Sequence, residues 1–368
     1  MKKLGFGCMR FPLLDENDVK SIDKPQVEAM FDRFLEQGFT YVDTAYPYHE
    51  GESERVVKAA LVDRYPREAY KLATKLPTFL LKEKEDCARY FNEQLEKTGA
   101  GYFDYYLIHC LTTDLYETAK KCDAFAFAAA MKAEGKVKEF GFSFHDTPEK
   151  LDEILTAHPE VDFVQLQINY LDWEALNVQS RGCYEVARKH KKEIVVMEPV
   201  KGGSLIRVPD EVAATFKEAD PNRSIASWAI RFAASLDGVR MVLSGMSNTE
   251  QMEDNLSYMD AFEPLSEAEM DMVLRAGEQI RKTIAIPCTA CEYCVAGCPM
   301  HICIPDYFKL YNERKQTLSA GKSKAYDELH ATHGKASACV ACGQCESICP
   351  QHLPIIENLR LVAETFEG

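Results

Sequence analysis

The sequence has no run of about 18 consecutive apolar residues, which is the length that a helix needs to cross a bilayer. It also lacks a recognisable signal peptide, because Met1-Lys-Lys-Leu-Gly leads directly into a predicted strand. No segment is of low complexity. We therefore expect a cytoplasmic protein that has no membrane as a partner.

An excess of positive charge is also lacking. The chain has 43 lysines and arginines against 58 aspartates and glutamates, a formal net charge of −15. Nucleic acids and anionic membranes bind basic surfaces, so this balance argues against both as partners. The simplest interpretation of the charge is solubility, and an acidic docking face is the alternative.

Cysteine, in contrast, is abundant. Of the 14 cysteines, eight fall into two tight runs after residue 287. The other six are scattered: Cys8, Cys87, Cys110, Cys122, Cys183 and Cys303. In the reducing cytoplasm that we expect, clustered cysteines indicate metal or cluster ligands rather than disulfides.

Short apolar runs alternate with amphipathic stretches as far as Met259. Strands are expected at Leu4–Met9, Tyr41–Thr44, Lys71–Lys75, Tyr105–His109, Glu139–Phe144, Phe163–Ile168, Ile194–Glu198 and Arg240–Gly245. Helices are expected at Pro25–Gln37, Glu52–Val62, Lys82–Lys97, Leu115–Ala133, Pro148–Ala157, Cys183–His190, Ser224–Ala234 and Thr249–Met259. Eight strands that are each followed by a helix predict an α/β protein with a (β/α)₈ TIM barrel.

Residues that typically begin or end helices refine the expected bounds of these elements. Gly38, Gly99 and Gly135 are expected to end helices, and Ser53 is expected to cap one. Ser266–Lys282 is expected to be a further helix packed outside the barrel. A barrel occupies about 250 residues, so this chain has room for a second unit. We expect a barrel domain over residues 1–283 and a smaller domain over 284–368.

Polar side chains stand at the ends of three successive predicted strands. Asp43 ends the first, and Tyr48 follows on the adjoining loop. Lys75 ends the second strand and His109 ends the third. Parallel barrels carry their catalytic groups at the carboxyl ends of their strands. Each residue also has a structural interpretation on its own: an internal ion pair, a surface tyrosine or a strand-end histidine.

The motifs around these residues resemble the aldo-keto reductase family. They are Gly5-Phe-Gly7, Asp43-Thr-Ala followed by Tyr48, Gly51-Glu-Ser-Glu54, Thr74-Lys75 and Leu107-Ile-His109, and the resemblance extends to about residue 280. It implies NAD(P)-dependent reduction of a small carbonyl substrate, or oxidation of an alcohol. It also implies that Tyr48 is the general acid and that Lys75 lowers the pKa of its phenol. Asp43 would pair with Lys75, and His109 would orient the carbonyl.

The same resemblance implies a set of cofactor contacts. The expected positions are Gly7, Cys8, Met9 and Asp43 near the nicotinamide ribose, Ser143 and Gln165 at the carboxamide, Met197 at the ring, Gly202, Gly203, Ser204 and Leu205 at the pyrophosphate, Gln251 at the 2′-phosphate, and Asp254 and Asn255 at the adenine. At or next to these positions, the sequence departs from the family in three ways. Met197 replaces a stacking aromatic, Glu198 a serine, and Gly245 and Gln251 basic residues. The choice between NAD and NADP therefore stays open, and Met197 leaves room for a flavin.

The two cysteine runs have the form C-x₂-C-x₂-C-x₃-C-P. This is the spacing of bacterial two-cluster [4Fe–4S] proteins, in which the fourth cysteine binds the other cluster. Cluster one should therefore use Cys288, Cys291, Cys294 and Cys349, and cluster two should use Cys339, Cys342, Cys345 and Cys298. Zinc sites more often use separated C-x₂-C pairs. The intervening segment Asp306–Leu329 has a helical pattern, which is typical of a helical ferredoxin-like domain.

Three hypotheses join the two halves. In the favoured one, the barrel uses NAD(P) while the clusters exchange electrons with an electron-transfer protein, sense redox state or support structure. In the second, the protein is a ferredoxin-linked reductase in which a flavin in the barrel converts single electrons into pairs. In the third, the protein is a non-enzymatic, nucleotide-binding regulatory subunit. We also expect the cluster domain to pack near the barrel mouth, since the segment after the last helix closes the substrate pocket in the family.

Overall fold

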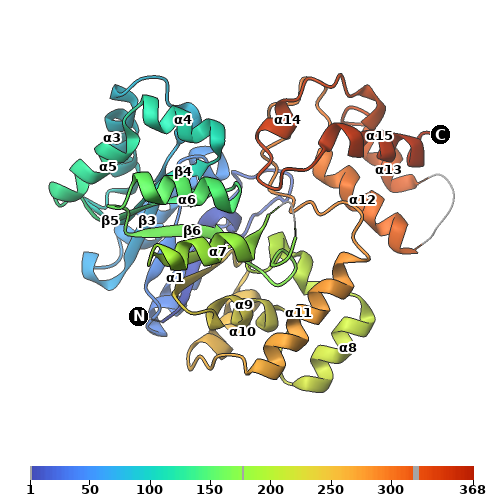
Figure 1. The fold of residues 1–368 in the computed structure, drawn as a ribbon, viewed down its shortest axis with the longest axis horizontal. Helices are drawn as coiled ribbons and strands as arrows, with labels where there is room; N and C mark the ends of the chain where they lie inside the picture. The colour runs from blue at the N-terminus through green and yellow to red at the C-terminus, as the bar shows by residue number, and fades with distance from the viewer. Residues whose placement is uncertain (1, 176–177, 318–322) are drawn as a thin grey trace.

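The computed structural model describes residues 2–175, 178–317 and 323–368. Eight parallel strands close into a barrel in chain order, with β8 pairing back to β1 (Figure 1). The strands are β1 (Leu4–Gly7), β2 (Tyr41–Asp43), β3 (Lys71–Leu76), β4 (Phe103–Leu111), β5 (Val137–Phe144), β6 (Phe163–Gln167), β7 (Glu193–Met197) and β8 (Val239–Ser244). The (β/α)₈ prediction is confirmed, and every strand ends within two residues of its expected bounds.

Helices surround the barrel because each has one apolar face to bury against the strands. They are α1 (Lys24–Glu36), α2 (Ser53–Val57), α3 (Glu85–Thr98), α4 (Thr113–Lys121), α5 (Ala124–Ala133), α6 (Pro148–Ala157), α7 (Ser180–Lys189), α8 (Asp210–Ala219), α9 (Ile225–Ser235), α10 (Thr249–Met259) and α11 (Glu267–Arg281). Gly38, Gly99 and Gly135 follow helices in the left-handed conformation, as predicted.

Three expectations about the helices were wrong in detail. The single helix expected at Leu115–Ala133 is broken between α4 and α5, where Asp123 adopts a φ of 52°. The segment after Arg207 contains helix α8, which is absent from the helices expected from the sequence. Ser53 does not cap α2 but is its first residue, and its hydroxyl contacts Thr44 Oγ1 at 2.9 Å inside the protein.

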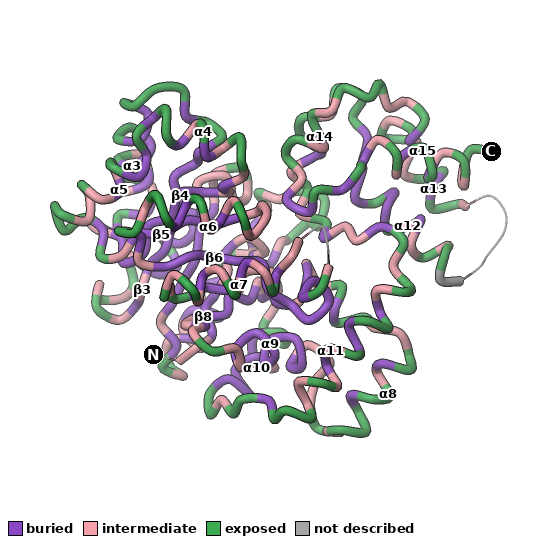
Figure 2. The backbone as a smooth tube through the Cα atoms, in the orientation of Figure 1, coloured by how far each residue is buried: buried purple, intermediate pink, exposed green. Residues whose placement is uncertain are grey.

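The apolar core has two parts in the barrel. The buried strands and the buried sides of the helices are drawn in purple in Figure 2. The larger part lies between the strands and the surrounding helices. The smaller one fills the barrel interior with eight side chains, namely Tyr41, Ala73, Tyr105, Leu107, Phe163, Val195, Met241 and Leu243. Because the interior is filled by bulky groups, polar side chains at the strand ends lie above a solid floor rather than along a channel.

The remaining chain forms a small helical module beside the barrel (Figure 1). Its helices are α12 (Ile304–Thr317), α13 (Lys324–His330), α14 (Gln344–Ser347) and α15 (Ile355–Phe366). The module has its own apolar core, in which Tyr307, Phe308 and Val362 are fully buried. The helical prediction for this part is confirmed, whereas the boundary between residues 283 and 284 stays a prediction.

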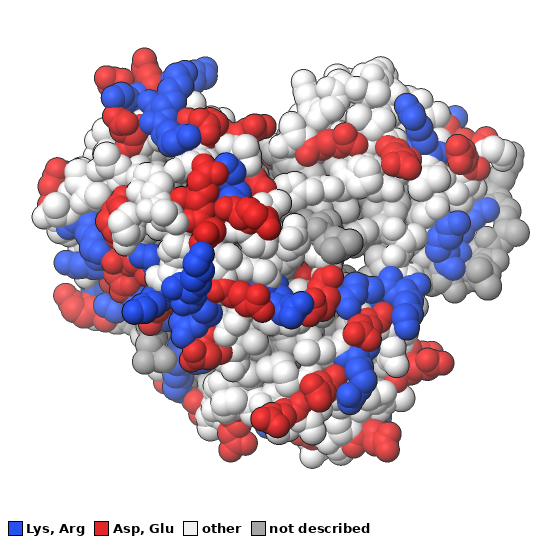
Figure 3. Space-filling model, in the orientation of Figure 1, with Lys and Arg blue, Asp and Glu red and all other residues white. Residues whose placement is uncertain are grey.

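The surfaces of the two parts differ in charge. On the face seen in Figure 3, acidic and basic side chains cover the barrel helices more densely than the module. The module also exposes apolar side chains, among them Met300, Val340 and Ile348. Within the described part of the chain, no helix is both long enough and apolar enough to span a membrane.

Candidate active site

Strand ends β2 and β3 bring three of the predicted catalytic residues into contact. The ammonium of Lys75 lies 2.5 Å from Asp43 Oδ1 and donates to the Tyr48 hydroxyl at 3.2 Å. It also donates to the Thr44 carbonyl oxygen at 2.8 Å. Asp43 and Lys75 are almost completely buried, whereas Tyr48 is half-buried. The phenol is therefore the most exposed member of this group, and all three residues line the cavity above the barrel.

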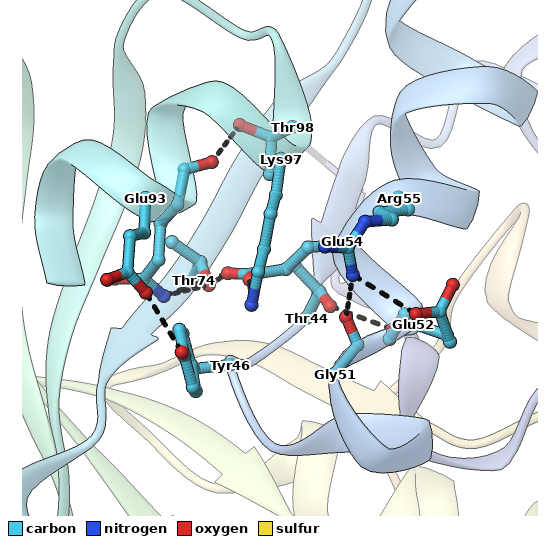
Figure 4. Close-up of polar contacts among 12 residues, drawn as sticks. Thr44, Tyr46, Gly51, Glu52, Glu54, Arg55, Thr74, Glu93, Lys97 and Thr98 are labelled. Atoms are coloured by element: carbon cyan, nitrogen blue, oxygen red, sulfur yellow. Dashed lines mark hydrogen bonds and ion pairs between the residues drawn. The ribbon is translucent and has the colours of Figure 1, made fainter. Parts of the chain in front are cut away.

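A second polar network is centred on Glu54, and Figure 4 shows Glu54 with Thr74 and Lys97. The fully buried Glu54 accepts hydrogen bonds from Thr74 Oγ1 and from Gln94 Nε2, both at 2.8 Å. Gln94 also donates to the Lys75 carbonyl oxygen at 3.0 Å, and Lys97 lies 3.6 Å from the other Glu54 oxygen. Helices α2 and α3 are thereby tied to the strand that carries Lys75, which fixes the direction of its side chain.

Burial is the largest cause of the pKa shifts of both the Tyr48 phenol and the Asp43 carboxyl. Burial raises the pKa of Asp43, and the neighbouring Lys75 opposes that shift. Burial also raises the pKa of the Tyr48 phenol well above its ordinary value, and Asp43 adds to the effect. The direction is therefore opposite to the lowering expected from Lys75, because desolvation is the largest cause of the shift. The phenol keeps its proton at neutral pH, which is the form that a general acid needs.

His109 lies on β4 and joins the same cavity. Its ring centre is 6.2 Å from that of Tyr48, edge to face. Burial, with Lys75 and His145 nearby, lowers the pKa of His109 well below its ordinary value, so the imidazole is neutral. Within the described chain, the buried Nδ1 atom of His109 has no hydrogen-bond partner. A neutral ring of this kind can bind the oxygen of a carbonyl group without adding a charge.

One cavity at the barrel mouth contains these four side chains together with most of the predicted cofactor positions. Its lining includes Gly7, Met9, Ser143, Gln165, Met197, Gly202, Gly203, Gln251 and Asn255. Four other predicted positions lie outside the lining. They are Cys8 and Leu205, which are fully buried, Ser204, whose hydroxyl donates to the Lys201 carbonyl, and Asp254, which accepts from Ser224. A larger cavity of 880 Å³ lies near Tyr46 and Lys58, away from the four catalytic positions.

The residues of this cavity fit a nicotinamide nucleotide. Gln165 Oε1 is buried and, among the described residues, has no hydrogen-bond partner, so it can accept from a carboxamide. Ser143 Oγ accepts from the Cys110 amide at 2.7 Å, which leaves its proton to donate. Gly202 and Gly203 adopt φ values of 63° and 97°, so their backbone can approach a phosphate closely.

Several residues of the cavity were not assigned to it from the sequence. Arg10 and Glu198 come from the barrel, whereas Cys291, Tyr293 and Pro350 come from the helical module. Glu198 adopts the left-handed conformation, and its buried Oε2 atom has no hydrogen-bond partner within the described ranges. The substitution of Glu198 for the family's serine was a signal in the sequence, but nothing local in the cysteine motif pointed to Tyr293.

Two further cavities in the module gather the cysteines in the predicted sets. One is lined by Cys288, Cys291, Cys294 and Cys349. The other is lined by Cys298, Cys339, Cys342 and Cys345. Among the described residues, no three His, Cys, Asp or Glu side chains are close enough to hold a single metal ion. Four thiols around a cavity fit a cubane, which spaces its ligands farther apart than one ion does.

The two cysteine motifs share their backbone as well as their spacing. Equivalent residues adopt positive φ values in both, namely Ala290 and Ala341, Glu292 and Gly343, and His301 and His352. Such positions are rare outside glycine, so their recurrence indicates that both loops turn in the same way around a similar object. The internal repeat that is visible in the sequence is thus also a repeat in three dimensions.

Polar contacts fix the module to the barrel mouth. Gln351 and Gln167 exchange two amide hydrogen bonds of 2.9 Å, and Lys201 donates to Gln351 at 3.1 Å. Lys201 is itself buried and paired with Asp172 at 2.7 Å. His352 bonds the His145 carbonyl oxygen at 2.8 Å. The prediction that the cluster domain packs near the barrel mouth is confirmed.

Comparison with known proteins agrees with this architecture. Residues 3–278 match the model of the aldo/keto reductase family, and residues 287–354 match that of a 4Fe-4S dicluster domain. The chain belongs to the aldo/keto reductase family and carries a C-terminal 4Fe-4S domain. It is therefore an oxidoreductase. This finding argues against the hypothesis of a non-enzymatic subunit.

Individual relatives are distant. The uncharacterised oxidoreductase YqkF of Bacillus subtilis is 22% identical over 71% of this chain and 88% of its own length. An aldo-keto reductase of Gibberella moniliformis is 25% identical over 61% of this chain and 67% of its own length. Aldo-keto reductase AKR11C1 from Bacillus halodurans has the same fold, with a TM-score of 0.61 and 23% identity, over 74% of this chain and 91% of that one. An aldo-keto reductase from Klebsiella pneumoniae, solved in complex with NADPH, gives a TM-score of 0.59 and 19% identity over 74% and 90%.

Proposed function

We propose that the protein is an NAD(P)H-dependent reductase of a small carbonyl compound, or catalyses the reverse oxidation of an alcohol. The observation that supports this most strongly is the contact of Tyr48 with Lys75 at 3.2 Å, with Asp43 on the other side of the ammonium. His109 completes the same cavity. The Klebsiella relative that was solved with NADPH supports a nicotinamide nucleotide as the cofactor.

The residues of this chain divide the work of the reaction. The protonated Tyr48 donates its proton to the substrate oxygen, while the neutral His109 holds that oxygen in place. Lys75 stabilises the phenolate that remains, and Asp43 keeps the ammonium directed at it. When bound, a nicotinamide supplies the hydride. Glu54 and Gln94 act as positioning residues, because they hold the backbone of Lys75.

The nucleotide preference rests on few contacts. Gly245 and Gln251 line the cavity where basic residues would bind a 2′-phosphate, and Gln251 accepts from the Ser247 amide at 2.8 Å. We therefore propose a site that accepts NAD as well as NADP. A flavin is a second candidate, favoured by one observation: Cys291, a proposed ligand of cluster one, lines the same cavity as Tyr48. A visible flavin band that remains after the clusters are bleached would identify this alternative.

The module is proposed to hold two [4Fe–4S] clusters in the cytoplasm, where its free cysteines stay reduced. Cluster two would exchange electrons with an external electron-transfer protein. Its ligand Cys342 is exposed, and Val340 beside it is 58% exposed. Exposed apolar side chains beside a redox centre suit brief docking of such a carrier.

The experiment that tests the reductase assignment is the substitution Tyr48→Phe. Removing the phenolic proton should lower kcat for carbonyl reduction roughly 10²–10⁴-fold, because a general acid contributes about that much. Tyr46→Phe is the matched control, since Tyr46 bonds Glu93 at 2.9 Å and lies outside the cavity of Tyr48. Wild-type turnover by Tyr48→Phe would refute the proposed role.

A further inference from the structure

The first cysteine loop, residues 288–294, is a wall of the barrel cavity. Cys291 and Tyr293 line the cavity that also contains Tyr48, Lys75 and His109. Tyr293 lies between two proposed ligands of cluster one, Cys291 and Cys294. A single short loop thus borders both the proposed cluster and the proposed reaction site.

The second cysteine loop, residues 339–345, has no such role. The position of Tyr293 in its motif is taken by Gln344, which is exposed. The position of Thr289 is taken by Val340, so a side chain that is 3% exposed in one loop is 58% exposed in the other. Side chains of the second loop are absent from the described lining of the barrel cavity. The two loops therefore form a natural pair of test and control.

The first loop also lies against the glycine loop that is proposed to hold the diphosphate. A Cβ atom on Gly202 would stand 2.2 Å from the Thr289 carbonyl oxygen, so the two backbones touch. Arg10 Nη2 bridges toward the same loop, donating to the carbonyl oxygens of Thr289 and Ala290 at 3.3 and 3.5 Å. A ligand on the glycine loop would thus lie next to the ligands of cluster one.

We propose that Tyr293 contacts the nucleotide bound in the barrel, and that occupancy of the cavity is thermodynamically linked to the oxidation state of cluster one. This inference depends on the proposed function, in which the barrel binds a nicotinamide nucleotide. Reduction adds one electron, and so one negative charge, to cluster one, with dithionite as the electron donor in the test. The diphosphate is an anion, so reduction weakens its binding. By reciprocity, the bound nucleotide lowers the potential of cluster one.

The size of the linkage follows from Coulomb's law. Two unit charges about 12 Å apart at an effective dielectric constant of about 20 change an equilibrium constant roughly tenfold. We therefore expect a dissociation constant that is about three- to tenfold larger for the reduced protein than for the oxidised protein. A tenfold change corresponds to a shift of about 59 mV in a one-electron potential.

The test is anaerobic calorimetric titration of the iron-loaded, full-length protein with ADP-ribose and with its 2′-phosphate. These probes carry the diphosphate but no nicotinamide, so they cannot exchange electrons with the clusters. Both oxidation states are titrated, and the two cluster potentials are followed by electron paramagnetic resonance with and without the probe. Weaker binding to the reduced protein, with one of the two potentials shifted, supports the linkage. Equal binding with unmoved potentials overturns it and leaves the reductase assignment standing. Binding in neither state overturns both.

Matched variants identify the loop responsible. Tyr293→Leu should raise the dissociation constant of NADPH about three- to tenfold, and Gln344→Leu should leave it unchanged. The potential that moves with ADP-ribose should be the one that Tyr293→Leu alters, not the one that Gln344→Leu alters. Iron content and spectra like those of the wild type show that both clusters remain in place. If both variants change NADPH binding equally, or if neither variant changes it, the proposed contact is refuted. Tyr293→Phe keeps the aromatic ring and should bind NADPH as the wild type does.

Discussion

The two cysteine motifs of the module have the same spacing and turn through the same left-handed positions, yet their surroundings differ. The first loop is buried against the barrel through Thr289 and contributes Tyr293 to the cavity. The second loop presents Val340 and Cys342 to solvent. The spacing of the cysteines therefore predicts which cluster each motif can bind. The residues around each motif determine whether that cluster lies near the barrel cavity or near solvent.

This difference suggests a direction for electrons within the proposed function. The exposed loop suits exchange with a carrier protein, and the buried loop adjoins the cavity of Tyr48. Cross-ligation ties the two together, because Cys349 lines the first cysteine cavity and Cys298 lines the second. Each motif therefore supplies one cysteine to the cavity that the other motif lines with three.

The largest expected effect comes from removing one proposed ligand from each cluster, which tests whether the two loops have different roles. Cys291→Ser and Cys342→Ser should each lose one cluster, seen as the loss of about half of the iron and of the cluster absorption. Only Cys291→Ser should also change the affinity for the nucleotide, because of these two cysteines only Cys291 lines the barrel cavity. Calorimetric titration with ADP-ribose checks this, and equal affinities for the two variants would contradict the assignment of separate roles.

A smaller effect is expected from Glu198, which faces the boundary between the barrel and the module. Burial raises the pKa of Glu198 to about 7, with Asp172 adding to the shift and Lys201 and Arg10 opposing it. The folded state then holds a proton that the unfolded chain has lost, so stability should fall as pH rises from about 4.5 to about 7. The loss should amount to at most about 3 kcal/mol.

The measurement is the free energy of unfolding against pH for wild type and Glu198→Gln. The variant cannot lose this proton, so its stability should stay flatter across that window. Glu185→Gln, on an exposed part of α7, is the control and should follow the wild-type curve. A slope unchanged by Glu198→Gln would show that another group carries the pH dependence.

The smallest effect concerns the contact between the glycine loop and the first cysteine loop. Gly202→Ala should destabilise the protein by about 1–2 kcal/mol for its φ of 63°, and further because its Cβ would meet the Thr289 carbonyl oxygen at 2.2 Å. Gly203 also has a positive φ, of 97°, but among the described residues no atom outside its two chain neighbours lies within 4 Å of its Cβ position, so Gly203→Ala is the control. The difference between the two melting temperatures isolates the contact, and equal temperatures would show that the loops do not press on each other.

Much of this architecture could be predicted from the sequence because it depends on local patterns. Alternating apolar runs located all eight strands, and residue spacing grouped Asp43, Tyr48 and Lys75. The pKa of Tyr48 was predicted in the wrong direction, since desolvation depends on the whole fold. Tyr293 was missed for a related reason: its place in the cavity arises from the docking of two distant segments, which no local pattern records.

The docking of the module against the barrel has a consequence for how the protein matures. Gln351, two residues after the proposed ligand Cys349, is 1% exposed and bonds both Gln167 and Lys201 of the barrel. Once the module has docked, a scaffold that delivers iron and sulfide meets one exposed cysteine in the second set, Cys342, but only partly or fully buried cysteines in the first. We therefore expect assembly to have an order, in which the inner cluster is inserted before the module closes onto the barrel and the outer one can follow at any time.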